Sequence, residues 1–130
     1  MVVTRINVIP VSELSDQHLV AEYRELPRVL KQHFNTENAP SNYCLGKGHV
    51  KWAKMHEKFI ACRYLDLCKE MHFRGFKTSY ATPFDILSFS NNYNPTQQDI
   101  ILNQKRIKEK YDIKPDWYRW TKRTKPKWII

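Results

Sequence analysis

The chain has 130 residues, of which 42% are hydrophobic and 13% aromatic, so it is long enough for one folded domain with a buried core and short for two. Its net charge of +9 favours a polyanionic partner. No stretch approaches the ~20 apolar residues of a membrane-spanning helix and no secretory signal is visible, so we expect a cytoplasmic protein with no membrane partner. We also expect a monomer.

The first predicted helix runs from about Ser12, a plausible N-cap, to Gln32. At about 100° per residue, one of its faces gathers polar and small residues within about 60° of arc, with Glu25 and His18 on its flanks. The members of this face are Gln17, Ala21, Arg24 and Arg28. The opposite face carries apolar residues at helical spacing and is predicted to face the core; they are Leu19, Tyr23, Leu26 and Leu30.

The second predicted helix runs from about Val50 to Arg74 and is expected to be the central helix of the core. Its apolar positions follow helical spacing and are Ile60, Tyr64, Leu67 and Met71. Gly75 suits a left-handed C-cap directly after it. Gly46 and Gly48 indicate a turn before it rather than a phosphate-binding loop.

Residues 78–95 are rich in turn-forming residues, with a possible short helix from about Phe84 to Ser88. The third predicted helix begins after Thr96, which forms a capping-box pattern with Asp99, and runs to about Tyr111. Ile100, Ile107 and Tyr111 are expected to face inward. The fold class predicted for residues 1–130 is therefore mainly α, a single compact domain of three principal helices with long loops.

Three cysteines, Cys44, Cys62 and Cys68, are odd in number and lack CxxC spacing. This pattern predicts free, buried thiols in a reducing compartment and no zinc site. A catalytic cysteine paired with His49 or His56 remains a minor alternative.

Most of the excess positive charge lies in residues 101–130. This region contains ten basic residues and three acidic ones, Glu109, Asp112 and Asp116, which gives a local net charge of +7. In the same region the run Trp117-Tyr118-Arg119-Trp120 places a basic residue among three aromatic ones. Proteins that stack on or wedge between bases often show this combination. A solvated basic tail with core-packing aromatic residues would show it too.

Four segments of the sequence, taken in order, resemble the viral pyrimidine-dimer DNA glycosylase/AP lyases of the endonuclease V family. They are Thr4 to Arg28, then Leu45-Gly46-Lys47-Gly48-His49-Val50, then Arg74-Gly75-Phe76, and finally Gln104 to Tyr118 with a Pro-x-Trp-Tyr element. After Arg119 this chain departs from the family, which tends to continue with tyrosines and a glycine, and reads Trp120-Thr121-Lys122.

The resemblance implies a role for each matching residue. Thr4 would supply the nucleophilic α-amine and Glu25 the catalytic carboxylate. Arg5, Arg24 and Arg28 would hold phosphates around the lesion, and Gln17 and His18 would line the same site. Arg106 and Lys110 would grip the DNA backbone, while Trp117 and Tyr118 would take part in dimer recognition.

Met1, Val2 and Val3 precede Thr4 here, so Thr4 has a free amine only if they are absent from the mature chain. Three possibilities stay open. Translation begins at the Val3 codon, read as a methionine that is then removed; or Val2 supplies the amine after loss of Met1; or the protein binds DNA without cleaving it.

The predicted function is excision of the 5′ base of cis-syn cyclobutane pyrimidine dimers in double-stranded DNA, through an imine with the N-terminal amine, followed by strand nicking by β-elimination. No metal and no organic cofactor is expected. The main alternative is a non-catalytic module that binds distorted duplex DNA. A metal-dependent nuclease is disfavoured because the sequence shows no carboxylate cluster.

Overall fold

The computed structural model describes residues 6–31, 36–78 and 91–129, and these residues contain four α-helices and no strand. The helices are α1 (Asp16–Lys31), α2 (His49–Met55), α3 (Glu57–Arg74) and α4 (Gln97–Ile113). Short 3-10 turns are formed by Val11–Glu13, Pro115–Trp117 and Lys127–Ile129. The mainly α prediction is confirmed, whereas the short helix expected at residues 84–88 lies outside the described residues. No helix of the described part is long and apolar enough to cross a membrane.

Helix α1 begins at Asp16, three residues later than an N-cap at Ser12 would place it. The Ser15 hydroxyl accepts a 3.1 Å hydrogen bond from the His18 amide, so Ser15 is the capping residue. Leu14, in extended conformation, is completely buried between the 3-10 turn and the helix. Burial of this leucine keeps residues 11–15 out of the helix, and the prediction of Ser12 as the cap is therefore wrong.

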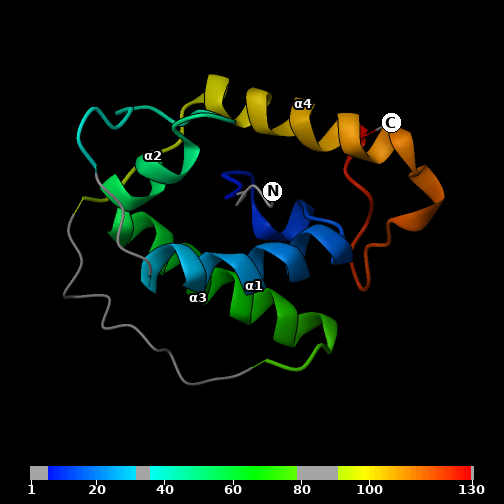
Figure 1. Cartoon of the computed structure of the whole chain (residues 1–130). Helices are drawn as coiled ribbons and strands as arrows, with labels where there is room; N and C mark the ends of the chain where they lie inside the picture. The colour runs from blue at the N-terminus through cyan, green and yellow to red at the C-terminus, as the bar shows by residue number, and fades with distance from the viewer. Residues whose placement is uncertain (1–5, 32–35, 79–90, 130) are drawn as a thin grey trace.

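Helices α1 and α3 pack side by side with opposite chain directions (Figure 1). The start of α1 meets the end of α3 through an Asp16–Arg74 ion pair, and farther along both helices Glu22 forms a second ion pair with Arg63. The predicted core stripes are confirmed, since all the apolar positions expected to face inward on α1 and α3 are buried except Tyr23, which is partly buried. Gly75 ends α3 with a φ of 89°, as a left-handed C-cap requires.

The predicted second helix is in fact two helices, because His56 interrupts it between α2 and α3. His56 has a φ of −121° and a ψ of 50°, outside the helical region. Its Nδ1 donates a 2.8 Å hydrogen bond to the Trp52 carbonyl, the acceptor that a continuing helix would offer to the backbone N–H of His56. A side chain thus replaces the backbone donor, an effect that the periodicity of apolar residues could not reveal.

Helix α4 begins with the predicted capping box, in which Thr96 and Asp99 each accept from the other's backbone amide. It extends to Ile113, two residues beyond the predicted end. Ile107 is buried as expected, and Ile100 and Tyr111 are partly buried. In Figure 1, α4 lies across the molecule from α1 and α3, and the N-terminal segment lies between them.

The N-terminal segment, residues 6–9, is almost completely buried although it belongs to no helix or strand. Side chains satisfy its backbone groups. The Ile6 amide donates to Nε2 of His49 at 2.7 Å, and the Ile6 carbonyl accepts from the Tyr43 hydroxyl at 2.8 Å. The Ile9 carbonyl accepts from Arg63. Because burial raises the pKa of Tyr43, with Glu22 contributing, this hydroxyl stays protonated and remains a donor.

Candidate active site

The exposed face of α1 forms one wall of a shallow groove with a volume of about 460 Å³. On α1 the groove is lined by Asp16, Gln17, Val20, Ala21 and Arg24. Gln17, Ala21 and Arg24 belong to the face that the sequence predicted, whereas Arg28, the fourth member of that face, does not line the groove. The other wall is formed by Phe76 and Trp117, which are far from α1 in the sequence. A helix face that carries Arg24 and the amide of Gln17 therefore meets two aromatic rings.

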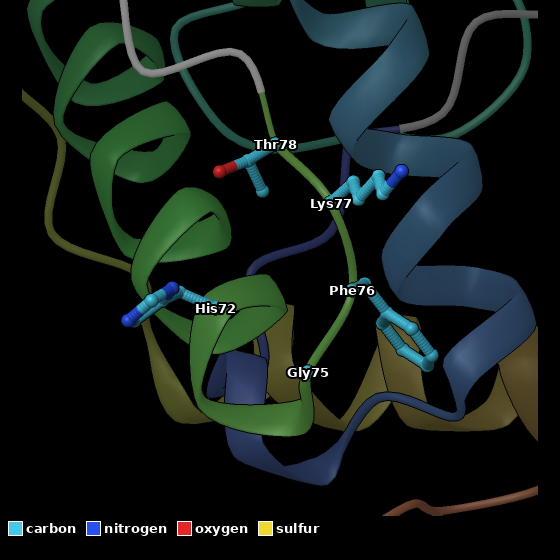
Figure 2. Close-up of a pocket in the computed structure, with 5 residues that line it drawn as sticks. All are labelled: His72, Gly75, Phe76, Lys77 and Thr78. Carbon is cyan, nitrogen blue, oxygen red and sulfur yellow. The ribbon is translucent and has the colours of Figure 1, made fainter.

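Phe76 reaches the groove because α3 ends directly before it. Gly75 adopts the left-handed conformation, and the Phe76 amide then donates to the Met71 carbonyl at 2.9 Å, which closes the end of the helix. Figure 2 shows that Phe76 and Lys77 leave this turn on the side of α1, whereas His72 points away. A second hollow, of about 450 Å³, lies on the other side of Phe76 and is lined also by His72, Gly75, Lys77 and Thr78.

Trp117 is held in place through Gln17. The Gln17 amide donates a 2.7 Å hydrogen bond to the Trp117 carbonyl and accepts one of 3.1 Å from the Arg119 amide. Gln17 thus lines the groove, as predicted, but both ends of its amide bind the protein's own backbone. The Trp117 side chain remains 58% exposed. Of the two aromatic residues predicted to recognise the lesion, Trp117 is the accessible one.

Tyr118 and His18 pack against each other instead of opening onto solvent. Their rings stack with centroids 4.9 Å apart and planes 2° from parallel. A 2.7 Å hydrogen bond joins Nδ1 of His18 to the Ser15 hydroxyl. On its other side Tyr118 contacts the ring of Tyr111. These contacts connect α1, the C-terminal segment and α4, so they give His18 and Tyr118 a structural role beside any role in recognition.

A buried ion-pair network fixes the C-terminal segment to the ends of α1 and α3. Arg74 bonds both Asp16 and Glu70, and Arg123 makes two hydrogen bonds of 2.8 and 2.9 Å to the Glu70 carboxylate. Asp16 also accepts from the backbone amide and the hydroxyl of Thr121. The hydrogen bond from Arg123, followed by those from Arg74, lowers the pKa of Glu70 despite its burial.

Glu25 and Arg28 form an exposed ion pair near the far end of α1, at 3.2 Å between Oε1 and Nη1. The side chain of Arg28 is 67% exposed and that of Glu25 is 23% exposed. Arg24, also exposed, directly precedes Glu25, so one carboxylate and two guanidinium groups occur within five residues of α1. The carboxylate is accessible to a ligand while the cations attract phosphate.

Glu22, three residues before Glu25, is a buried carboxylate that sequence reasoning missed. It accepts from Nε and Nη2 of Arg63 at 2.7 and 3.1 Å, and from the amide of Asn7 at 2.8 Å. Its side chain is only 1% exposed. A signal was present in the sequence, because Glu22 shares helical spacing with the buried residues Leu19, Leu26 and Val29.

Thr4 and Arg5, the predicted nucleophile and a predicted phosphate ligand, lie outside the described residues. The chain that leads to them is placed, however. The Asn7 side chain donates to Glu22 on α1, and the backbone amide of Ile6, the residue before it, donates to His49. Arg74 donates to the carbonyls of Val11 and Ser12 near the start of α1. The segment from Ile6 to Ser12 therefore lies beside the first part of α1, with Asn7 at the level of Glu22 and Ser12 near Asp16.

The predicted backbone-binding residues Arg106 and Lys110 lie on α4 and not in the groove. The Arg106 side chain is 39% exposed and lies 3.9 Å from Glu109, a contact too long and too exposed to neutralise it. Lys110 is partly exposed. Both cations sit one turn apart on the same helix, as predicted, but the structure does not bring them together with Arg24 and Arg28.

The cysteines are free, as predicted, and of the three only Cys68 is buried, with Cys44 and Cys62 partly exposed. Burial raises the pKa of both Cys44 and Cys68, which disfavours the nucleophilic thiolate. Within residues 6–31, 36–78 and 91–129, no group of three or more His, Cys, Asp or Glu side chains could hold a metal ion.

The sequence matches the family described as pyrimidine dimer DNA glycosylase over residues 3–83, well over half of the chain. The matched range contains all of α1 with Glu25, Arg24 and Arg28, the N-terminal segment, and the turn that carries Phe76. It ends before α4 and the aromatic C-terminal segment. Arg24, Glu25 and Arg28 of α1 lie within the matched range, and this chain belongs to the pyrimidine dimer DNA glycosylase family.

Proposed function

We propose that this DNA repair glycosylase excises the 5′ base of cis-syn cyclobutane pyrimidine dimers in double-stranded DNA and then nicks the strand as an AP lyase. The observation that carries the proposal is the partly exposed ion pair of Glu25 with Arg28, next to Arg24 in the sequence, within the segment that matches the family. Thr4, whose α-amine is the proposed nucleophile, belongs to the same segment.

The α-amine is the amine best suited to attack at neutral pH. An α-amino group has a pKa of about 7.7 to 8.0, so roughly a tenth or more of it is uncharged at pH 7, against about 0.04% of a lysine with a pKa of about 10.4. The described N-terminal segment supports its delivery to the site. A chain spans at most about 3.6 Å per residue, so the Cα atom of Thr4, three residues before Asn7, lies no farther than about 11 Å from the Cα atom of Asn7, whose side chain bonds Glu22.

The proposed reaction proceeds in balanced steps. The amine nitrogen bonds to C1′ while the bond between C1′ and the pyrimidine nitrogen breaks, and the base leaves with the bonding electron pair and is protonated. Opening of the sugar ring gives an imine. Glu25 then removes a proton from C2′, the electrons form a C2′–C3′ double bond, and the 3′ phosphate leaves. Water hydrolyses the imine and restores the free amine.

The remaining residues bind the substrate in this proposal. Arg5, Arg24 and Arg28 contact phosphates near the lesion, with Gln17 and His18 beside them, while Arg106 and Lys110 on α4 hold the DNA backbone farther away. Trp117 is exposed at the groove and is suited to pack against a displaced base, with Tyr118 supporting it. A duplex weakened by a dimer is kinked at lower cost, which provides selectivity without readout of sequence.

The alternative is a module that binds distorted duplex DNA without cleaving it, and the residues before Thr4 make it testable. Two proteins are prepared, one that begins at Thr4 and one that begins at Val2, and the N-terminus of each is verified by mass. Each is incubated with a dimer-containing duplex and sodium borohydride, which reduces an imine to a stable covalent adduct. A copy of the Thr4 protein with an acetylated N-terminus is the control.

We expect the Thr4 protein to form an adduct and to nick the strand, and the acetylated control to bind without doing either. An adduct with the Val2 protein alone would move the nucleophile to Val2. Binding without an adduct by either protein, in a preparation that binds the lesion specifically, would refute the lyase mechanism and favour the non-catalytic alternative.

A further inference from the structure

Asn103, in the middle of α4, is a buried amide that serves no purpose within its own helix. Its residue is 1% exposed, and its side chain points away from the solvent face of α4. The Oδ1 atom accepts two hydrogen bonds, from the backbone amides of Val8 at 2.7 Å and Ile9 at 3.1 Å. The Nδ2 atom donates to Oδ1 of Asn7 at 2.8 Å. Three consecutive residues of the N-terminal segment are therefore bound by one side chain.

These contacts continue to α1 and α3. The Oδ1 atom of Asn7 accepts from Asn103, and its Nδ2 atom donates to Glu22. Arg63 donates both to Glu22 and to the Ile9 carbonyl. In Figure 1 the N-terminal segment lies between α4 and the α1–α3 pair. Asn103 thus provides the link from α4 to the segment, and Glu22 with Arg63 provides the link from the opposite side.

An extended segment with no partner strand can slip along its own axis unless specific groups fix it. Apolar contacts of Ile6, Val8 and Ile9 are non-directional and tolerate such a shift. Hydrogen bonds to successive backbone amides do not tolerate it, because a slip of one residue would leave buried N–H groups without acceptors. Hydrogen bonds with His49, Tyr43 and Arg63 hold Ile6 and Ile9 at the two ends of the segment. Asn103, together with Asn7, binds its middle and so contributes to its register along α1.

We propose that Asn103 is a positioning residue for the reaction, which holds the N-terminal segment in the register that brings the α-amine to the DNA. The inference rests on the proposed function, since it assumes that this amine is the nucleophile. Thr4 is separated from Val8 by only four residues, so a shift in register at Val8 is transmitted along the chain to the amine. A misplacement of about 1 Å at a reacting group can lower a rate about 100-fold.

The test separates chemistry from binding in the Asn103→Ala protein. With saturating dimer-containing duplex and borohydride, the rate constant for adduct formation is expected to fall about 10- to 100-fold relative to the parent protein. The dissociation constant, measured without borohydride, should change by less than about threefold, because no proposed DNA contact is removed. An unchanged rate constant would overturn the proposal, and so would a loss confined to binding.

A matched variant controls for lost stability. Ile107→Ala truncates a buried apolar residue one turn farther along α4, on the same face, without touching the N-terminal segment by any hydrogen bond. Both proteins are assayed well below their unfolding temperatures. Ile107→Ala should form the adduct within about twofold of the parent rate. An equal loss in both variants would show that Asn103 acts through general stability and would refute a positioning role.

Asn7→Ala provides an independent readout through a double-mutant cycle. If Asn7 and Asn103 fix the same register, the combined variant should lose little more rate than either single variant. Fully multiplicative losses would contradict the inference. Should Asn103→Ala not fold, Asn103→Leu, which is close in volume but removes the acceptor for Val8 and Ile9 and the donor to Asn7, is measured in the same way and judged by the same two outcomes.

Failure of this inference and failure of the proposed function are distinguishable. A parent protein with a verified Thr4 amine that forms no adduct refutes the proposed mechanism before any variant is made. A parent protein that forms the adduct at the same rate as Asn103→Ala leaves the mechanism intact and refutes only the positioning role.

Discussion

Glu22 and Glu25 lie three residues apart on α1, but they face opposite environments. Glu22 points between α1 and the N-terminal segment, where Arg63 and Asn7 bind both of its oxygens. Glu25 points toward solvent, where its partner Arg28 is itself 67% exposed. A carboxylate whose oxygens are all engaged by buried donors has no capacity to accept a proton from a substrate, whereas an exposed ion pair exchanges easily with a ligand.

The comparison shows how one helix can serve stability and chemistry at the same time. The buried face of α1 uses its carboxylate to fix Arg63 and the N-terminal segment, and the exposed face leaves its carboxylate free to be displaced from Arg28. The two glutamates should therefore respond in opposite ways to the same substitution, glutamate to glutamine, which preserves shape and removes charge.

The largest effect is expected for Glu25→Gln on catalysis. Loss of a general base that removes the C2′ proton should lower the single-turnover nicking rate by about 10² to 10⁴-fold, with little change in stability because its partner Arg28 is 67% exposed. Nicking of dimer-containing duplex measured by gel electrophoresis checks this. Asp66→Asn, an exposed change of the same charge on α3, is the control and should nick normally. Equal rates for Glu25→Gln and this control would exclude a catalytic role for Glu25.

Glu22→Gln is expected to affect stability most. It leaves the guanidinium of Arg63, only 7% exposed, without a counter-charge, which costs about 3 to 5 kcal/mol of unfolding free energy. Urea unfolding followed by tryptophan fluorescence measures the loss. Glu109→Gln, which removes an exposed 3.9 Å pair with Arg106, should lose less than about 1 kcal/mol. A similar small loss for Glu22→Gln would mean that the buried network does not stabilise the fold.

Glu70→Gln tests the network that holds the C-terminal segment, through its pH dependence. The folded pKa of Glu70 lies below its unfolded value of about 4.3, so its contribution is fully present above that pH and disappears as the pH falls through the folded pKa. We expect Glu70→Gln to lower the free energy of unfolding by about 2 kcal/mol at pH 7, and the difference between the two proteins to shrink as the pH falls below about 4. Unfolding free energies of both proteins between pH 3 and 7 check this, and two parallel curves would contradict it.

The smallest effect is expected at Lys122, which has a φ of 60° in the left-handed region. That conformation costs a side-chain-bearing residue about 1 to 2 kcal/mol, and the extra freedom of glycine in the unfolded chain offsets part of the gain. Lys122→Gly should therefore raise stability by about 0.5 kcal/mol. Thr124→Gly, at a neighbouring exposed position without a positive φ, should lower it. Calorimetry measures the unfolding of both variants. If both substitutions lower stability, the backbone at Lys122 is not strained.

The sequence determined the features that depend on local spacing. The core stripes of α1 and α3, the Thr96–Asp99 capping box and the Gly75 cap all follow from side chains within a few residues of one another, and the structure confirms each of them. The shared face of Gln17 and Arg24 was fixed in the same way, since the helical repeat alone brings these residues together.

Tertiary structure decided which polar groups are buried and which distant segments meet. The break at His56 arises because a side chain competes for the Trp52 carbonyl, and Phe76 and Trp117 line the groove only because the ends of α3 and the C-terminal segment dock beside α1. Asn103 and Glu22 are bound over separations of up to 96 residues. Periodicity reports how one helix divides its faces, but hydrogen bonds between segments far apart in the chain depend on how those faces are assembled, and that information is not contained in any local pattern.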